Sequence, residues 1–223
     1  MLGIIGGTAL LQAKLPPLKK KTIATPFGSA EVMLGDIVFL SRHQGNIPPH
    51  KINHRANLSA LKICGVDKLI VIGSTGGMKP EYTPGSFVIL SDWFSPFDIP
   101  TLHDNDVYHV PPSVDSELSE ALTEIVPSSK RGVYFQAHGP RFETKAEIKF
   151  FSSVCDVVGM TAASELTLAN ELKIPAAALC TVDNFANGVG GADAPDFDEI
   201  VKIAKSNGDR MTEILSRIVK RLK

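Results

Sequence analysis

The chain has 223 residues, of which 43% are hydrophobic and 21% are charged, and its formal net charge is −1. A chain of this length can bury a large core without disulfides or metal ions to stabilise it. The near-neutral charge balance lacks the basic character expected of a protein that binds nucleic acid or an anionic membrane surface. We therefore expect no nucleic-acid or membrane partner, and we expect any bound anion to be held by a local site.

Cysteine usage and the N-terminal segment bear on the compartment. Cys64, Cys155 and Cys180 lie in hydrophobic surroundings without the spacing typical of metal ligands, which favours free thiols in a reducing compartment. Segment 1–11 is apolar, but it has no basic region and contains two adjacent glycines, so it predicts a buried strand and turn rather than a signal peptide. No run approaches the roughly 18 apolar residues that a spanning helix needs. We expect a cytoplasmic protein.

Short apolar runs dominate the first half of the chain, and each is followed directly by small or polar residues. This pattern is typical of buried strands that lead into loops. One further segment has apolar residues at helical spacing. The runs predict strands at 2–5, 37–40, 68–72 and 86–90, and a helix at 53–64.

The second half alternates between helical and strand patterns. Ser113 or Ser116 is a candidate cap for a helix that Pro127 ends. The alternation predicts an α/β fold, a three-layer sandwich with a mixed central sheet flanked by helices, in a single domain over 1–223. Segment 92–112 is the longest expected loop. Further helices are expected at 144–152, 163–172 and from 195 onward, and strands at 132–137, 156–158 and 176–182.

Three glycine-rich segments follow expected strands: 6–8, 73–77 and 188–191. Successive backbone N–H groups in such segments can bind an anion, but none fits the dinucleotide or P-loop fingerprint, so each alone favours an ordinary turn over a phosphate site. Arg42 and His43 follow another strand, and an Arg and a His beside backbone donors would suit a phosphate dianion. Ligand sites in α/β sheets gather at such strand ends.

Two polar groups could recognise a flat heterocycle. Phe142 followed by Glu143 at a helix start could stack on a ring and accept its N–H, although the local pattern alone favours a hydrophobic staple with a first-turn acid. Asp183 and Asn184 end an apolar strand, where a plain turn is an equally good local explanation.

Taken together, these segments resemble the trimeric branch of the purine nucleoside phosphorylase and methylthioadenosine phosphorylase family. The resemblance covers most of the chain in family order, leaving mainly 98–130 and the C-terminal helix unmatched. It implies phosphorolysis of a purine nucleoside, with inorganic phosphate as co-substrate and without a metal or an organic cofactor. The matching stretches include IIGGTAL, SRH, INHRANLSALKICGVDKLIVIGSTGGM, GSFVILSDWF, AHGPRFETKAEI, VVGMTAASELTLANEL and VDNFANG.

The resemblance also assigns roles to residues of this chain. It implies that Asn184 and His43 are catalytic and that Met160 lies against the ribose. Phe142 would contact the base, whose edge Glu143 and Asn184 would read near Ala186. The implied phosphate site comprises Thr8, Arg42, His43, the backbone of Gly73 and Ser74, and Thr161.

The base-reading positions suggest the substrate. Adenosine-type members of this branch carry aspartates where this chain has Asn184 and Ala186. An asparagine can donate to O6 or N7, and Glu143 can accept from N1–H, so we expect a preference for 6-oxopurines. A methylthioadenosine or methylthioinosine phosphorylase is the nearest alternative, with Trp93, Phe94 and Phe97 as candidates for a 5′-methylthio pocket. A nucleoside-binding protein without catalysis is a distant one.

Several positions depart from the family pattern. The segment after His43 is short, and His50 could fill part of the missing space; Gly73 stands where relatives carry Asn or Thr; and 163–165 replaces a Pro-Glu pattern. The resemblance implies a homotrimer or a dimer of trimers, with 92–112 as the expected contact and 187–197 as a possible lid. We expect the acidic residues Asp193, Asp196, Asp198 and Glu199 not to form a metal site, and we expect Asp196 or its neighbours near Pro195 to cap the terminal helix.

Overall fold

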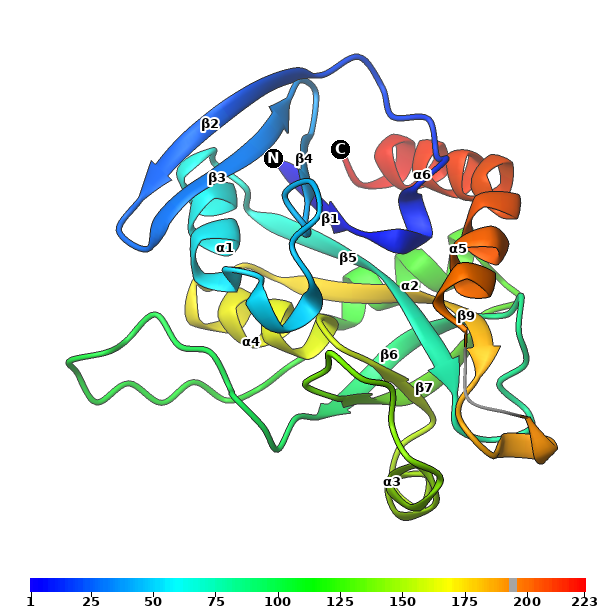
Figure 1. Ribbon diagram of the computed structural model, residues 1–223. Helices are drawn as coiled ribbons and strands as arrows, with labels where there is room; N and C mark the ends of the chain where they lie inside the picture. Colours follow the sequence, from blue (N-terminus) through cyan, green and yellow to red (C-terminus); the bar gives the residue numbers. More distant parts are fainter. Residues whose placement is uncertain (193–195) are drawn as a thin grey trace.

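The computed structural model describes residues 1–192 and 196–223. Within these residues, nine strands form one mixed sheet in the order β2-β3-β4-β1-β5-β8-β7-β6-β9, with helices on both faces (Figure 1). The strands are β1 (Leu2–Gly6), β2 (Lys19–Thr25), β3 (Gly28–Leu34), β4 (Val38–Ser41), β5 (Lys68–Gly77), β6 (Phe87–Phe94), β7 (Lys130–Gln136), β8 (Val157–Gly159) and β9 (Ala176–Phe185). The helices are α1 (His54–Ile63), α2 (Ser116–Ile125), α3 (Lys145–Phe151), α4 (Ala162–Glu171), α5 (Phe197–Ser206) and α6 (Gly208–Leu222), with 3-10 turns η1 (Thr8–Leu10), η2 (Pro49–Lys51) and η3 (Val189–Gly191).

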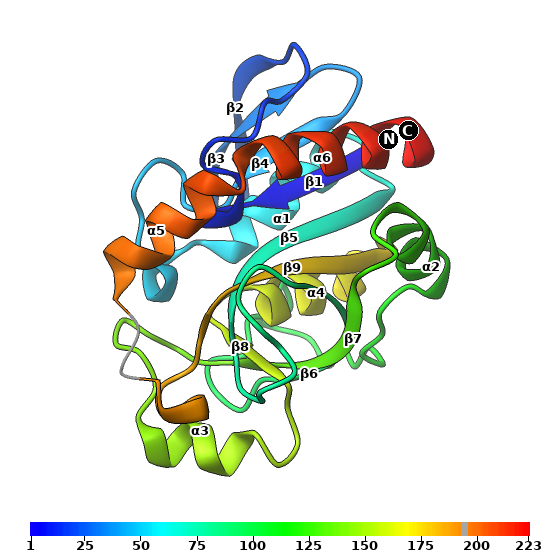
Figure 2. The same ribbon diagram turned by 90° about the vertical axis from the view of Figure 1, so that its right-hand side faces the viewer.

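The core has two apolar layers, one on each face of the sheet, because successive strand residues point to opposite faces. On β1, Ile4 belongs to the layer under α2 and α6, whereas Ile5 belongs to the layer under α1 and α4. Figure 2 shows α4 and α6 on opposite sides of β5. The predicted mixed sheet flanked by helices is therefore confirmed.

Half of the sheet closes on itself, which the sequence did not predict. In addition to its neighbours in the strand order, β9 pairs in parallel with β5, so β5, β8, β7, β6 and β9 form a closed ring. The closure is possible because β5 and β9 have ten residues each. The first part of β5 pairs with β1 and β9, and its last two residues, Gly76 and Gly77, also pair with β8.

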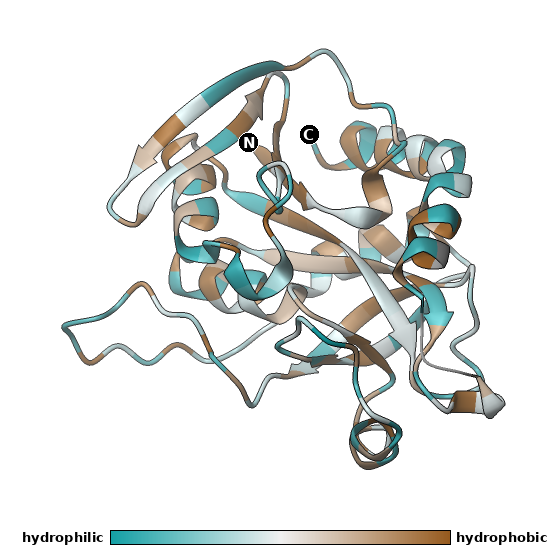
Figure 3. Cartoon of the chain, viewed as in Figure 1, coloured by the Kyte–Doolittle hydropathy of each residue, from teal (hydrophilic) through white to brown (hydrophobic). Residues whose placement is uncertain are grey.

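Several local predictions need correction. The sequence did not predict the β2–β3 hairpin. β2 is an edge strand in which Ile23 is the single buried residue, so its sequence lacks the apolar alternation of a strand. Figure 3 shows a hydrophilic stretch along β2, whose sequence begins with three lysines. The cap of α2 is Asp115, whose side chain accepts from the Leu118 N–H, rather than Ser113 or Ser116. Segment 73–77 continues β5 and is not a turn.

The C-terminal region also differs from its prediction. The expected long helix is two helices, α5 and α6, which meet at Asn207. Asp196 caps α5 as predicted, through its side chain and the Asp198 N–H. Three predictions fall on residues 193–195, which lie outside the described residues. They are the role of Asp193, the start of the terminal helix at Pro195 and the middle of the expected lid.

The predicted long loop leaves the body of the molecule between β6 and α2 (Figure 1). Because β6 continues to Phe94, the loop begins at Ser95 rather than at Asp92. Across the two described stretches, we find no helix that combines the length and the apolar character needed to cross a membrane.

Candidate active site

One cavity of about 680 Å³ lies at the carboxyl ends of β1, β4, β5 and β9. This is the edge where ligand sites form in α/β sheets, because parallel strands deliver their loops there. Residues from α5 and from the segment before α3 complete its wall. Ten of the predicted site residues line it together: Thr8, Arg42, His43, Ser74, Phe142, Glu143, Met160, Thr161, Asn184 and Ala186.

Arg42 enters this cavity already paired. Its Nε and Nη2 each donate to a carboxylate oxygen of Glu165 at 2.7 Å, and its Nη1 donates to the Ile72 carbonyl at 2.9 Å. Arg42 is 2% exposed and Glu165 is fully buried. Burial lowers the pKa of the guanidinium and the Glu165 charge raises it, with a net upward direction. The pair fixes the guanidinium plane beside the cavity and leaves further N–H groups on Nη1 and Nη2 for an anion.

Gly7 makes room for Arg42 and His43. A Cβ at this position would lie 2.9 Å from His43 Nε2 and 3.1 Å from Arg42 Nη1, so any side chain would displace one of them. The His43 Nδ1 is hydrogen-bonded to the Ile47 carbonyl at 2.8 Å. Because that carbonyl is an acceptor, the bond places the proton on Nδ1 in the neutral ring. Burial, aided by the Arg42 charge, lowers the pKa of His43.

Thr161 is the N-cap residue of α4, but its side chain makes no capping bond. The first helical N–H groups are satisfied instead by the Tyr134 hydroxyl, which accepts from the Thr161 N–H at 3.1 Å and from the Ala162 N–H at 3.3 Å. The Thr161 hydroxyl is therefore free to meet a ligand in the cavity. The positive end of the α4 dipole lies behind it, which favours an anion there.

The opposite part of the cavity holds a buried carboxylate oxygen that lacks a partner. Glu143 is 7% exposed, and its Oε1 is buried without a hydrogen bond to any described residue. Burial raises the pKa of Glu143. The Asn184 amide donates to the Phe185 carbonyl at 2.7 Å, and the Asn187 amide donates to the Glu143 carbonyl at 3.1 Å. An unpaired buried acceptor such as Glu143 Oε1 is costly, so this end is arranged to be completed by a ligand.

Two residues need reassignment. Gly73, whose backbone was predicted to contact phosphate, is not among the residues that line the cavity. A Cβ at this position would lie 2.7 Å from the Cys180 sulfur. Glu165 was given no role in the sequence analysis, where only its segment 163–165 was noted as departing from the family pattern, yet it holds Arg42. The signal that could have revealed it is an acidic residue within an otherwise small and apolar helical stretch, because a buried glutamate needs a partner.

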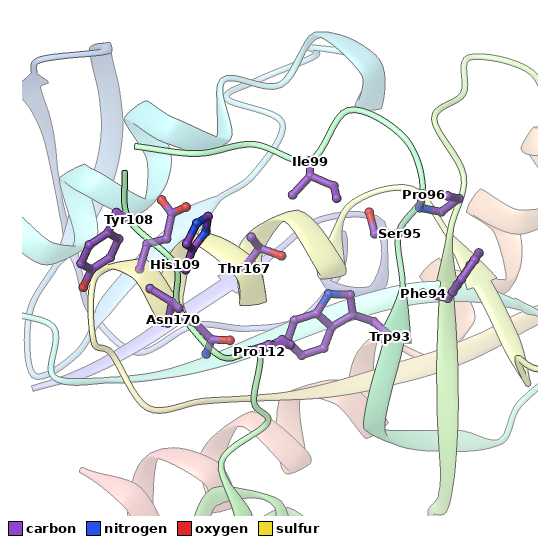
Figure 4. Close-up of a pocket in the computed structure, with 12 residues that line it drawn as sticks. Trp93, Phe94, Ser95, Pro96, Ile99, Tyr108, His109, Pro112, Thr167 and Asn170 are labelled. Carbon is purple, nitrogen blue, oxygen red and sulfur yellow. The ribbon is translucent and has the colours of Figure 1, made fainter. Parts of the chain in front are cut away.

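The candidates for a 5′-methylthio pocket lie elsewhere. Trp93 and Phe94 line a second cavity of about 420 Å³ between the long loop and α4 (Figure 4). Phe97 and His50 line a third cavity of about 200 Å³, where the rings of His50 and His138 are 6.3 Å apart. The main cavity has an apolar wall of its own, made of Leu11, Ile47, Pro48, Pro49, Phe197, Ile200 and Val201.

Comparison with known proteins shows the family of the chain. The phosphorylase superfamily matches residues 2–220. The chain belongs to this superfamily. It is 41% identical to the probable 6-oxopurine nucleoside phosphorylase of Archaeoglobus fulgidus, over all of this chain and 97% of that protein. It is 35% identical to the probable S-methyl-5′-thioinosine phosphorylase of Methanocaldococcus jannaschii, over 98% of this chain and 92% of that protein.

Solved structures agree on the fold of this phosphorylase-superfamily chain. The methylthioadenosine phosphorylase of Schistosoma mansoni in complex with adenine superposes with a TM-score of 0.88, covering 98% of this chain and 90% of that one. The sequence identity is 23%, so the likeness concerns the fold alone.

Proposed function

We propose that the chain is a purine nucleoside phosphorylase, a pentosyltransferase that cleaves a purine nucleoside with inorganic phosphate to free base and ribose 1-phosphate. The observation that carries this proposal is one cavity with two chemically different ends. Arg42, Thr161 and Thr8 offer donors to an anion, while Phe142, Glu143 and Asn184 offer a ring contact, an acceptor and an amide. The named relatives support the same class.

In this proposal the residues position the reactants and stabilise charge. A phosphate oxygen forms a bond to ribose C1′ while the C1′–N9 bond breaks. The electron pair of the C1′–N9 bond goes to the purine. Hydrogen phosphate supplies the proton that the neutral base finally carries, so charge balances. The amide of Asn184 would turn from the Phe185 carbonyl to donate to the departing purine, whose negative charge grows in the transition state. No metal or organic cofactor is part of this scheme.

We propose a preference for 6-oxopurine bases. The unpaired Glu143 Oε1 can accept the N1–H that a 6-oxopurine carries and adenine lacks, and Asn184 can donate to O6. A site that pairs such groups rejects the wrong base strongly, because its own buried atoms are then left unsatisfied. Relatives named as 6-oxopurine nucleoside phosphorylases, at 41% and 34% identity, support this preference.

The Asn184→Asp substitution tests the reading of the base edge. A carboxylate at this position accepts hydrogen bonds, so it should favour the 6-amino group and repel O6. We expect the ratio of kcat/KM for adenosine to that for inosine to rise about 10-fold or more. An unchanged ratio in a folded variant would overturn the assignment of Asn184.

A second candidate function is phosphorolysis of a 5′-methylthio nucleoside. The apolar wall that includes Leu11, Ile200 and Val201 is the part of the main cavity that phosphate and base do not account for. A methylthio group gains more from burial on such a wall than a hydroxyl does. A relative named as a probable S-methyl-5′-thioinosine phosphorylase supports this candidate.

We also propose a cytoplasmic homotrimer, or a dimer of trimers, in which the loop of residues 95–115 contacts the next subunit. The support is apolar surface: Phe97, Ile99 and Val107 are 50%, 62% and 89% exposed. Exposed apolar residues grouped in this way are typical of association surfaces. Light scattering of the purified protein measures the mass, and a monomer at micromolar concentration would contradict the proposal.

The decisive test is release of free base from inosine, guanosine, adenosine, methylthioinosine and methylthioadenosine, each with and without phosphate. Phosphate-dependent cleavage of inosine and guanosine supports the 6-oxopurine nucleoside assignment. A clear advantage for methylthioinosine over inosine supports the second candidate and keeps the base assignment. Absence of phosphate-dependent turnover on all five substrates would refute both.

A further inference from the structure

Asp183 lies directly behind the main cavity without lining it. It is fully buried, and it precedes Asn184, which does line the cavity. The ladder between β5 and β9 changes register here, since Thr75 pairs with Val182 and Gly76 pairs with Asn184. Asp183 is therefore the extra residue of a β-bulge. Bulges redirect side chains, and they are over-represented beside active sites.

The bulge directs Asp183 onto Ser74. The Ser74 hydroxyl donates a short hydrogen bond to Asp183 Oδ2, and the other carboxylate oxygen, Oδ1, is buried without a partner in the described part of the chain. A serine hydroxyl has a single hydrogen, and in Ser74 this hydrogen is used in the hydrogen bond that Asp183 accepts. Ser74 itself lines the cavity, so it presents lone pairs there, with a carboxylate behind them.

The position of Ser74 on β5 indicates which part of a substrate it meets. Ile72, two residues before it, holds Arg42 through its carbonyl, and Gly76, two residues after it, pairs with Asn184. Ser74 is therefore about 7 Å along the strand from the phosphate end and about the same distance from the base end. The part of a nucleoside between its base and the attacking phosphate is the ribose.

Resting on the proposed function, we propose that Asp183 is a positioning residue which, through Ser74, aims a hydrogen-bond acceptor backed by a carboxylate charge at the ribose. Ribose is neutral in the bound nucleoside and gains positive charge as the C1′–N9 bond breaks. A fixed negative group beside it therefore stabilises the transition state more than the ground state. Asp183 neither exchanges a proton nor forms a bond in this role.

Burial bears on the charge of this carboxyl group. It raises the pKa of Asp183, while the hydrogen bond from Ser74 acts in the opposite direction. A raised pKa means that the carboxylate form is present at the alkaline side, so we would carry out the test at mildly alkaline pH.

The test compares Asp183→Asn, Ser74→Ala and the double variant with the wild type. Asp156→Asn is the matched control, because Asp156 accepts from Lys79 and from the Val133 N–H away from the cavity. Steady-state kinetics separate kcat from KM for inosine. Calorimetry measures binding of a nucleoside analogue with a protonated nitrogen in place of the ribose ring oxygen, and of its uncharged carbocyclic counterpart.

We expect Asp183→Asn to lower kcat on the order of 10-fold with little change in KM, and Asp156→Asn to leave kcat unchanged. Asp183→Asn should weaken binding of the cationic analogue about 10-fold while the uncharged analogue binds as before. The double variant should resemble the single ones, because Asp183 acts through Ser74. An equal loss of binding affinity for both analogues, or an unchanged kcat, would overturn the proposal. If the wild-type protein shows no phosphorolysis, the proposed function is refuted instead. The difference in binding between the two analogues still tests the effect of the Asp183 charge.

Discussion

The two ends of the main cavity differ in how far the protein has already paired their polar groups. At the phosphate end, Arg42 is bonded to Glu165 and Ile72, and His43 is bonded to Ile47. At the base end, Glu143 Oε1 is buried without a bond to any residue that the structure describes. The first end is organised by the fold itself, whereas the second is completed by its ligand. Substitutions at the first should therefore affect stability and phosphate binding, and substitutions at the second should affect specificity.

The largest effect that the comparison predicts is on stability. Glu165→Gln removes one charge of a pair that is almost entirely withdrawn from water, and it leaves the buried guanidinium uncompensated. Breaking such a pair costs about 3–5 kcal/mol. We expect the free energy of unfolding, measured by urea titration, to fall by about that amount.

A surface ion pair provides the control for this substitution. Asp36 pairs with Lys223 at the exposed side of the molecule, and Asp36→Asn should cost less than about 1 kcal/mol. If Glu165→Gln proved as stable as Asp36→Asn, the phosphate end would not be organised by the buried pair.

The next effect concerns phosphate alone. Gly7→Ala places a Cβ against His43 and Arg42, so one of the two must shift. A displacement near 1 Å in a positioned group can lower the reaction rate about 100-fold. We expect KM for phosphate to rise about 10- to 100-fold. Binding of free hypoxanthine, measured by calorimetry, should stay within about twofold, because the base end is unchanged. A comparable loss of hypoxanthine binding would mean that the two ends are not independent.

At the base end, Glu143→Gln should affect specificity. The amide loses the carboxylate charge, and hydrogen bonds to charged groups contribute about 1.5–3 kcal/mol. We expect kcat/KM for inosine to fall about 10- to 100-fold while KM for phosphate is retained. Because Glu143 Oε1 is buried without a bond to the described residues, the thermal midpoint should not fall. A lower midpoint with unchanged kcat/KM would assign Glu143 to the fold rather than to the base.

The smallest effect is a displaced pH profile. Burial raises the pKa of Glu143, and its carboxylate must be ionised to accept N1–H. Activity is then present above the raised pKa and is lost as the pH falls through it, so the acid limb of kcat/KM should lie above the ordinary glutamate value of about 4.3. The pKa of His43 is lowered by burial, so its ring becomes charged at a lower pH than an ordinary histidine. Glu143→Gln should remove the limb; a limb that persisted would belong to another group, such as Asp183.

Local sequence patterns predicted the parts of this molecule whose cause is local. Strands ending in small or polar residues correctly indicated where the loops of the cavity would lie. The helix predicted at 144–152 agrees with α3, whose capping box between Thr144 and Glu147 acts within one turn. β2 escaped prediction because an edge strand with one buried residue carries no apolar period.

The sequence by itself determined the α/β class, the strand ends and, through the family resemblance, the side chains that line the main cavity. The tertiary structure alone decided which of them pair. Arg42 meets Glu165 across 123 residues of sequence, and Ser74 meets Asp183 across 109. The closure of β5 onto β9 brings the second pair together and turns Gly73 away from the cavity. No periodicity or spacing carries this information, because hydrogen bonds between distant segments depend on strand order and register, which are properties of the whole sheet.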